Sequence, residues 1–313
     1  MKYPKFLKEN DCIGITALSS GAGNKILEVK TSLNHLKEHF RLIVTPNVWG
    51  DEIVSSSVDT RVREFNDLLN EDIQALMNIR GGDFAYETLD QLDLEKIVKK
   101  KLLVQGFSDT TFLVYPLTTK YDLATLYGAN AKSFDSEILE EYQLVNLEFL
   151  KGNLVDQVSY NDRNTYSVNG NFKSSGVFIG GCLDVIRYLL GTDFDGTKEF
   201  INKYKDKKII WYFDIFGMGS VDVYMTLIQM RNMGYFKYTD TLIFGSVKYP
   251  RIECLLEYSQ AYKRALDDKN IIIDANIGHV KPDFTILNGG LGTVTFKNNV
   301  LKIKQELMNE DNG

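Results

Sequence analysis

A serine lies between two apolar runs in the stretch LLVQGFSDTTFLVYPL, residues 102–117. The apolar run before it predicts a short strand, and 110–119 predicts a helix. Gly106 leaves room for a sharp turn that exposes Ser108 at its tip, the geometry of a nucleophilic serine. The same pattern fits a plain helix cap, because Ser108 or Asp109 can accept hydrogen bonds from a helix N-terminus. Both interpretations remain open from this segment alone.

A serine nucleophile needs a general base, and the chain has three histidines. His279 lies in ANIGHVKPDF, just after a predicted strand over 270–275, and loops at strand ends often carry functional groups. His35 and His39 belong to HLKEH, which matches the zinc-binding pattern H-x-x-E-H. The apolar residues around them also fit an ordinary helix over 24–39 with a solvated histidine face. We therefore expect His279 to be the base.

A base of this kind works best beside a carboxylate that orients its imidazole ring. Asp214 directly follows the apolar segment KIIWYF, residues 208–213, which predicts a buried strand. An acid at that place can orient a histidine, cap the next helix or simply lie on the surface.

Alternating strands and helices must position these groups. The first half predicts βαβ units and a mostly parallel sheet, in which ligands bind at the carboxyl ends of the strands. Gly81, Gly82 and Ser108 all follow predicted strands. The predicted strands are 12–18, 42–46, 74–79 and 102–106, and the predicted helices are 24–39, 57–70 and 110–119.

A polar segment over 151–172 separates a second unit of the same kind. We therefore predict an α/β protein with an N-terminal domain at 1–150, a linker at 151–172 and a C-terminal β/α domain at 173–313. The predicted strands of the second domain are 175–179, 208–213, 241–247, 270–275 and 292–296, and its predicted helix is 221–233.

Composition restricts the classes of protein. The chain has 313 residues with 44% hydrophobic and 25% charged residues and a net charge of −6, which suits a globular protein without a nucleic-acid partner. No apolar stretch has the length of a membrane span or a secretory signal. The three cysteines, Cys12, Cys182 and Cys254, form no metal-binding pair, so we expect a reducing cytoplasm and no metal site.

Five segments, in order, resemble motifs of the LD-carboxypeptidases, a group of serine peptidases that includes the microcin C immunity hydrolases. The resemblance runs from about residue 11 to 290. It implies a first domain with a flavodoxin- or amidotransferase-like sheet and a site between the two domains. The segments are DCIGITALSSG, DTRVREFNDLLNEDIQALMNIRGG, QGFSDTT, FIGGCLDVIRYLLGT and IGHVKPDFTILNGG.

The resemblance implies roles for individual residues. QGFSDTT puts Ser108 at the nucleophile, and IGHVKPDF puts His279 at the base. The family's third member is usually a Glu at the end of a buried strand. An ungapped count back from LIQM puts Asp214 there, whereas a count forward from KII puts Phe213 there, and we favour the acid.

The same resemblance implies that the backbone N–H group of Asp109 and one from Gly81 or Gly82 form the oxyanion hole, with no metal or organic cofactor. Four departures from the family pattern concern the site. Asp214 is one methylene shorter than Glu, so the backbone must approach His279 more closely. Tyr127 and Cys182 stand where a His and an Asn are common. Asp83-Phe84 replaces the usual turn after the glycines, which changes substrate contacts.

The resemblance implies a small peptide substrate: a murein (peptidoglycan) peptide, cut at the L-D amide bond that releases a terminal D-alanine. A microcin-immunity-like amidase acting on peptidyl or aminoacyl nucleotides is the alternative. It needs an aromatic shelf for the base, which the linker tyrosines Tyr160 and Tyr166 could provide. A binding protein that has lost catalysis is a third possibility. The resemblance also implies a homodimer.

Overall fold

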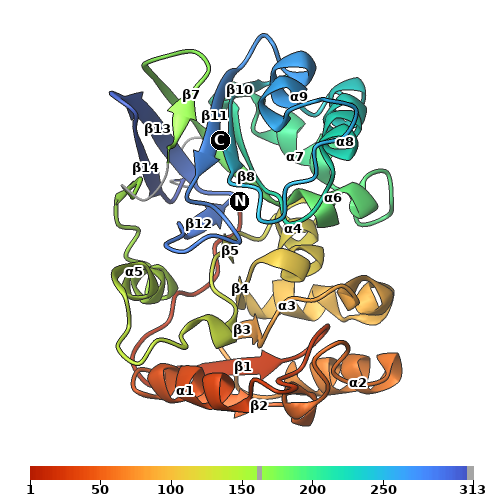
Figure 1. The fold of residues 1–313 in the computed structure, drawn as a ribbon. Helices are drawn as coiled ribbons and strands as arrows, with labels where there is room; N and C mark the ends of the chain where they lie inside the picture. The colour runs from red at the N-terminus through yellow and green to blue at the C-terminus, as the bar shows by residue number, and fades with distance from the viewer. Residues whose placement is uncertain (161–163, 309–313) are drawn as a thin grey trace.

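The computed structural model describes residues 1–160 and 164–308 as two sheets flanked by helices (Figure 1). The first sheet has the strand order β12-β5-β4-β3-β1-β2, and the second has the order β6-β14-β13-β8-β9-β10-β11-β7. Both sheets contain a parallel core of strands connected through helices, as the alternation in the sequence predicts. The predicted α/β class is therefore confirmed.

In the first sheet, the five strands β2, β1, β3, β4 and β5 are parallel, and β12 pairs antiparallel with β5. The strands of this sheet are β1 Cys12–Thr16, β2 Arg41–Val44, β3 Ala75–Asn78, β4 Leu103–Gln105, β5 Thr125–Tyr127 and β12 Ile286–Asn288. The helices of this half are α1 Ile26–Lys37, α2 Val58–Leu68, α3 Leu94–Lys100, α4 Thr111–Thr119 and α5 Glu141–Leu150. Its short 3-10 turns are η1 Pro46–Trp49, η2 Ala85–Gln91, η3 Ser108–Thr110 and η4 Ala131–Ser133.

In the second sheet, β8, β9, β10 and β11 are parallel, and an antiparallel hairpin of β13 and β14 extends it beyond β8. The strands are β6 Gln157–Val158, β7 Tyr166–Ser167, β8 Phe172–Cys182, β9 Ile209–Asp214, β10 Thr239–Gly245, β11 Asn270–Ala275, β13 Leu291–Lys297 and β14 Val300–Glu306. The helices are α6 Leu183–Leu189, α7 Thr197–Lys203, α8 Ser220–Asn232 and α9 Tyr258–Ala265, with a 3-10 turn η5 at Lys205–Lys207. The segment 151–172 is not only a linker, since the short strands β6 and β7 form the two edges of this sheet.

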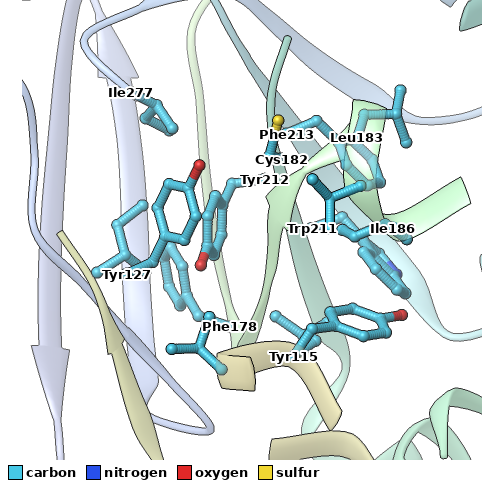
Figure 2. Close-up of a cluster of buried hydrophobic side chains, with 14 of the residues drawn as sticks. Tyr115, Tyr127, Phe178, Cys182, Leu183, Ile186, Trp211, Tyr212, Phe213 and Ile277 are labelled. Carbon is cyan, nitrogen blue, oxygen red and sulfur yellow. The ribbon is translucent and has the colours of Figure 1, made fainter. Parts of the chain in front are cut away.

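Two features join the halves. Strand β12 comes after the second sheet in sequence but pairs with β5 of the first, so residues 276–285 cross from one sheet to the other. Figure 1 shows β12 beside β5, between the two halves. Helix α4 is buried along its whole length, because its apolar residues face both sheets. Figure 2 shows one of them, Tyr115, against Trp211 of β9, with a ring-centroid distance of 6.5 Å.

Candidate active site

Ser108 lies at a sharp turn between β4 and α4. Its φ angle is +61°, a left-handed conformation that non-glycine residues rarely adopt and that is typical of an exposed nucleophile on a strained turn. Gly81, which follows β3, lies against this turn. A Cβ atom at Gly81 would be 2.9 Å from Ser108 Oγ, so only glycine permits the approach. The sequence places both residues after parallel strands, and the structure brings them into contact.

His279 faces Ser108 from the crossing segment between β11 and β12. Its Nε2 atom is 2.9 Å from Ser108 Oγ, and its Nδ1 atom is 2.8 Å from Asp214 Oδ2 and 3.0 Å from Oδ1. The ring lies between Phe107 and Phe216, with centroid distances of 5.1 and 4.6 Å. Nδ1–H therefore donates to the carboxylate, which leaves Nε2 as an acceptor for the serine hydroxyl.

Asp214 ends β9 and is fully buried. Besides His279 Nδ1, its carboxylate accepts hydrogen bonds from the Tyr127 hydroxyl at 2.7 Å and the His279 backbone N–H at 3.3 Å. A buried carboxylate is stable when several donors share its charge. The backbone does approach closely, as a short acid requires: a Cβ at Gly278 would lie 1.9 Å from Asp214 Cγ.

Two nearby residues have other surroundings: Phe213, the alternative from the forward count, and Asp222, an acid on α8. Phe213 is buried among aromatic rings on the opposite face of β9, 5.4 Å from Trp211 and 5.5 Å from Phe244 between ring centroids. Asp222 is half exposed and forms ion pairs with Arg187 and Arg251.

The predicted oxyanion donors lie beside Ser108. Within residues 1–160 and 164–308, the backbone N–H groups of Gly81, Gly82 and Asp109 have no protein acceptor. Asp109 N lies 3.4 Å from the position of a Cβ on Gly81, so the glycine turn and the start of the 3-10 turn η3 are adjacent. Unpaired N–H groups next to a nucleophile can stabilise an oxyanion.

The loop after the glycines is held by side chains. Asp109 Oδ2 accepts from Ala85 N–H at 2.9 Å, and Ser19 Oγ accepts from Phe84 N–H at 2.9 Å. The buried Arg61 donates to the carbonyl of Phe84 at 3.0 Å. Burial raises the pKa of Asp109 to about 6, against the opposing hydrogen bonds from Ser19 and Ala85.

Two cavities meet at Ser108. One of about 490 Å³ also contacts Gly81, Gly82 and His279, and the other of about 330 Å³ contacts Asp109 and Cys182. A third cavity, of about 620 Å³, adjoins the other side of His279.

Charge is unevenly distributed in the 490 Å³ cavity. At one corner, Lys132 and Lys281 share the carboxylate of Asp135 at 2.7 and 3.3 Å, so the corner carries one unit of excess positive charge. The hydrogen bonds and charges of the two lysines outweigh burial and lower the pKa of Asp135. Asp83 and Glu52 also line the cavity, and Glu52 pairs with Arg80 at 3.5 Å.

Aromatic rings line the 330 Å³ cavity. Tyr86 stacks on Phe112 at a centroid distance of 4.8 Å and lies 6.4 Å from the nearly parallel ring of Tyr188. The linker tyrosines are not among the residues that line the cavities at Ser108 in the described part of the chain: Tyr160 packs on Phe284, and Tyr166 lies on β7.

His35 lies on α1 and His39 just after it, and in the described part of the chain neither lines the cavities at Ser108. His35 Nε2 is 3.0 Å from the carbonyl oxygen of Ser136, and its Nδ1 is 3.6 Å from Glu38. Among the residues that the structure describes, no group of three or more His, Cys, Asp or Glu side chains has an arrangement that could hold a metal ion.

Comparison with known sequences assigns each half of the chain to a described protein domain. The LD-carboxypeptidase N-terminal domain matches residues 13–128, and the LD-carboxypeptidase C-terminal domain matches residues 175–294. The chain belongs to the LD-carboxypeptidase family. It is therefore a serine peptidase-like hydrolase, as its motifs predicted.

The similar sequences carry two kinds of name, carboxypeptidase and microcin self-immunity protein. The putative carboxypeptidase YocD of Bacillus subtilis (strain 168) is 25% identical over 322 residues, covering 92% of this chain and 94% of that protein. The microcin C7 self-immunity protein MccF of Escherichia coli is 37% identical over 75 residues, which cover 24% of this chain and only 22% of MccF.

Solved structures show the same fold. MccF in complex with aspartyl sulfamoyl adenosine has a TM-score of 0.77 at 18% identity, over 98% of this chain and 99% of that one. The muramoyltetrapeptide carboxypeptidase of Oxalobacter formigenes has a TM-score of 0.76 at 16% identity, over 95% and 100%. The proteins similar to this chain thus include some named as carboxypeptidases and some named as microcin self-immunity proteins.

Three residues at the site are hard to predict from the sequence. Phe107 and Phe216 flank His279, and each is close in sequence to a predicted site residue, Ser108 or Asp214. Tyr127 contacts the acid itself. Its position departs from the family pattern, but nothing in the sequence indicates its contact with Asp214.

Proposed function

We propose that this protein is a serine carboxypeptidase that hydrolyses the L-D amide bond before the terminal D-amino acid of a murein peptide. The observation that carries the proposal is the continuous line of Ser108, His279 and Asp214, with hydrogen-bond distances of 2.9 and 2.8 Å. In this proposal Ser108 is the nucleophile, His279 the general base and Asp214 the group that orients the imidazole.

In the first step, Ser108 Oγ forms a bond to the amide carbon while its proton passes to His279 Nε2. The carbonyl electron pair moves onto oxygen, which the N–H groups of Asp109 and of Gly81 or Gly82 stabilise. The C–N bond then breaks, and the proton on Nε2 passes to the nitrogen of the leaving D-amino acid.

In the second step, a water molecule attacks the acyl-enzyme and gives a proton to His279 Nε2. The ester bond to Ser108 breaks, and the proton returns to Oγ. The products are the shortened peptide with a new carboxyl group and the free D-amino acid. Asp214 stays ionised throughout and stabilises the imidazolium.

The positive corner of the 490 Å³ cavity suits a substrate with a free carboxylate. Lys132 and Lys281 share one acid there, so a second carboxylate that enters this corner meets net positive charge. A terminal D-amino acid supplies such a carboxylate.

A second candidate is the hydrolysis of a peptidyl or aminoacyl nucleotide. The aromatic rings of Tyr86 and Tyr188 beside Ser108 favour it, because flat rings stack on nucleobases. A structural neighbour, MccF, binds aspartyl sulfamoyl adenosine according to its description. Both reactions use the same serine chemistry, so the substrate distinguishes them. A binding protein without catalysis is the remaining alternative.

The test compares two substrates in one assay. Wild type is incubated with a tetrapeptide ending in D-alanine and, separately, with aspartyl sulfamoyl adenosine, and the products are separated by chromatography. Release of D-alanine supports the carboxypeptidase, and release of aspartate from the nucleoside supports the second candidate. Ser108→Ala should abolish either reaction, and a fluorophosphonate probe should label wild type but not this variant. Turnover by Ser108→Ala would refute the mechanism.

The proposal includes a homodimer in the cytoplasm, with two domains at 1–150 and 173–313 joined by 151–172. Light scattering coupled to gel filtration measures the oligomeric state. None of the described helices is long and apolar enough to cross a membrane.

A further inference from the structure

Tyr127 connects the two halves of the candidate site. It is the last residue of β5 in the first sheet and is fully buried. Its hydroxyl group is 2.7 Å from Asp214 Oδ2, at the end of β9 in the second sheet. The same oxygen lies 3.4 Å from the backbone nitrogen of Ser108. One phenol therefore contacts the acid and the turn that carries the nucleophile.

The phenol can act on the carboxylate only as a donor. Burial, together with the charge of Asp214, raises the pKa of Tyr127 well above its usual value, so its proton is retained. The Ser108 N–H points at the same oxygen and supplies the complementary contact, in which the phenol accepts. This arrangement fixes both the direction and the protonation state of the hydroxyl group.

We propose that Tyr127 is a positioning residue, which acts through Asp214 by holding its carboxylate in the orientation that His279 requires. This inference rests on the proposed serine mechanism. Asp214 Oδ2 receives the Tyr127 hydroxyl and His279 Nδ1 together, at 2.7 and 2.8 Å. The carboxylate of an aspartate rotates freely about its terminal torsion unless its oxygens are bound. The phenol on one side and the His279 backbone on the other remove that freedom.

The neighbouring ionisable groups do not replace the phenol. Cys182, on β8 beside Asp214, is buried, and burial with the charge of Asp214 raises the pKa of its thiol well above the usual value. Its sulfur is 3.8 Å from Asp184 Oδ2. Asp283, in the same crossing segment as His279, has its pKa raised to about 8, mainly by burial and further by the charge of Asp214, so it is largely neutral at pH 7. Tyr212 lies on β9 itself, and its hydroxyl donates to Asn288 at 2.8 Å.

Tyr212 provides a matched control for the experiment. Its ring centroid is 5.4 Å from that of Tyr127, and both side chains are fully buried. The two hydroxyl groups point in opposite directions (Figure 2). Replacing either tyrosine by phenylalanine removes one buried hydroxyl from the same cluster: Tyr212 loses its hydrogen bond to Asn288, and Tyr127 loses those to Asp214 and from the Ser108 N–H. Only Tyr127→Phe removes a contact to Asp214.

The experiment measures the second-order rate constant for labelling by a fluorophosphonate between pH 5 and 9. Tyr127→Phe should lower the plateau rate by about 10-fold to 100-fold, as expected for the loss of a hydrogen bond to a charged group. It should also raise the apparent pKa of the acid limb, because the carboxylate charge is then shared less and stabilises the imidazolium more. The labelling rate constant of Tyr212→Phe should stay within about 2-fold of wild type. Its melting temperature should change by about as much as that of Tyr127→Phe.

A double variant distinguishes positioning from a general structural effect. In an Asp214→Asn background, Tyr127→Phe should change the rate by less than about 2-fold, because the group through which it acts is already lost. Equal rates for Tyr127→Phe and Tyr212→Phe would overturn the inference, and so would a full additional loss in the Asp214→Asn background. Failure of wild type to react, or labelling of Ser108→Ala, would instead overturn the serine mechanism and the inference with it.

Discussion

Replacing Asp214 by Asn is the sharpest test of the acid. The carboxylate accepts from three donors: the Tyr127 hydroxyl, His279 Nδ1 and the His279 backbone N–H. An amide of the same shape offers one acceptor oxygen and one donor group, so at least one of these donors must face an NH₂ group. The imidazole then turns or changes tautomer, and Nε2 no longer accepts the serine proton. In a serine triad the same change costs about 10⁴-fold in kcat, or roughly 5.5 kcal/mol of transition-state stabilisation.

The assay is kcat on a tetrapeptide ending in D-alanine, measured for wild type and the Asn variant on the pH plateau. Asp222→Asn is the control, because Asp222 is an acid on the following helix α8 and is half exposed beside Arg187 and Arg251. It should retain activity within about 3-fold, since exposed ion pairs contribute little. An Asp214→Asn variant that is folded and within about 10-fold of wild type would refute the triad reasoning and leave a Ser108–His279 dyad.

Four further predictions concern neighbouring positions. Asp214→Glu, which family resemblance alone would favour, should lower kcat by at least about 10-fold, because Gly278 packs against the carboxyl group and leaves no room for a methylene. Gly278→Ala should fail to fold stably or lose activity in a thermal-melt and kcat assay, since its φ is +84° and a Cβ would lie 1.9 Å from Asp214 Cγ. Because the pKa of Asp109 is raised to about 6, its stabilising effect is present below about pH 4 and lost as pH rises to 6. Denaturant titrations from pH 4 to 8 should therefore show Asp109→Asn gaining about 2 kcal/mol of unfolding free energy relative to wild type over that range, and no trend would contradict the assignment. The double variant of His35 and His39 to Ala should keep wild-type kcat with or without EDTA, and a loss on chelation would revive the zinc interpretation.

The longer elements could be predicted from the sequence because their patterns are local. The apolar run before Asp214 became β9 Ile209–Asp214, and the periodic segment 57–70 became α2 Val58–Leu68. Strands β5 and β12 have only three residues each, too few for a pattern of alternation. Their pairing joins residues about 160 positions apart in the sequence. The contacts that stabilise it are therefore not visible in either segment alone.

Residues of the candidate site could be predicted where a chemically suitable residue type stands at the end of a predicted strand. Ser108 and Asp214 each end or follow a parallel strand, where sheet geometry gathers functional groups. His279 could be predicted from its loop and its motif. Tyr127 also ends a strand, but an aromatic residue there fits a core equally well. Only the packing of two sheets against each other shows that its hydroxyl reaches Asp214.

The distance in space between the nucleophile Ser108 and the base His279 depends on how the two sheets are joined. Ser108 belongs to the first sheet, and Asp214 belongs to the second. His279 belongs to the segment that leaves the second sheet at β11 and enters the first at β12. Because this segment is anchored at both ends, its length and pairing register fix where the imidazole lies. A change that shifts the β12 register by one residue would reverse the faces of Ile286–Asn288 and displace His279, so we expect the pairing with β5 to matter for catalysis as much as the contacts of the histidine itself.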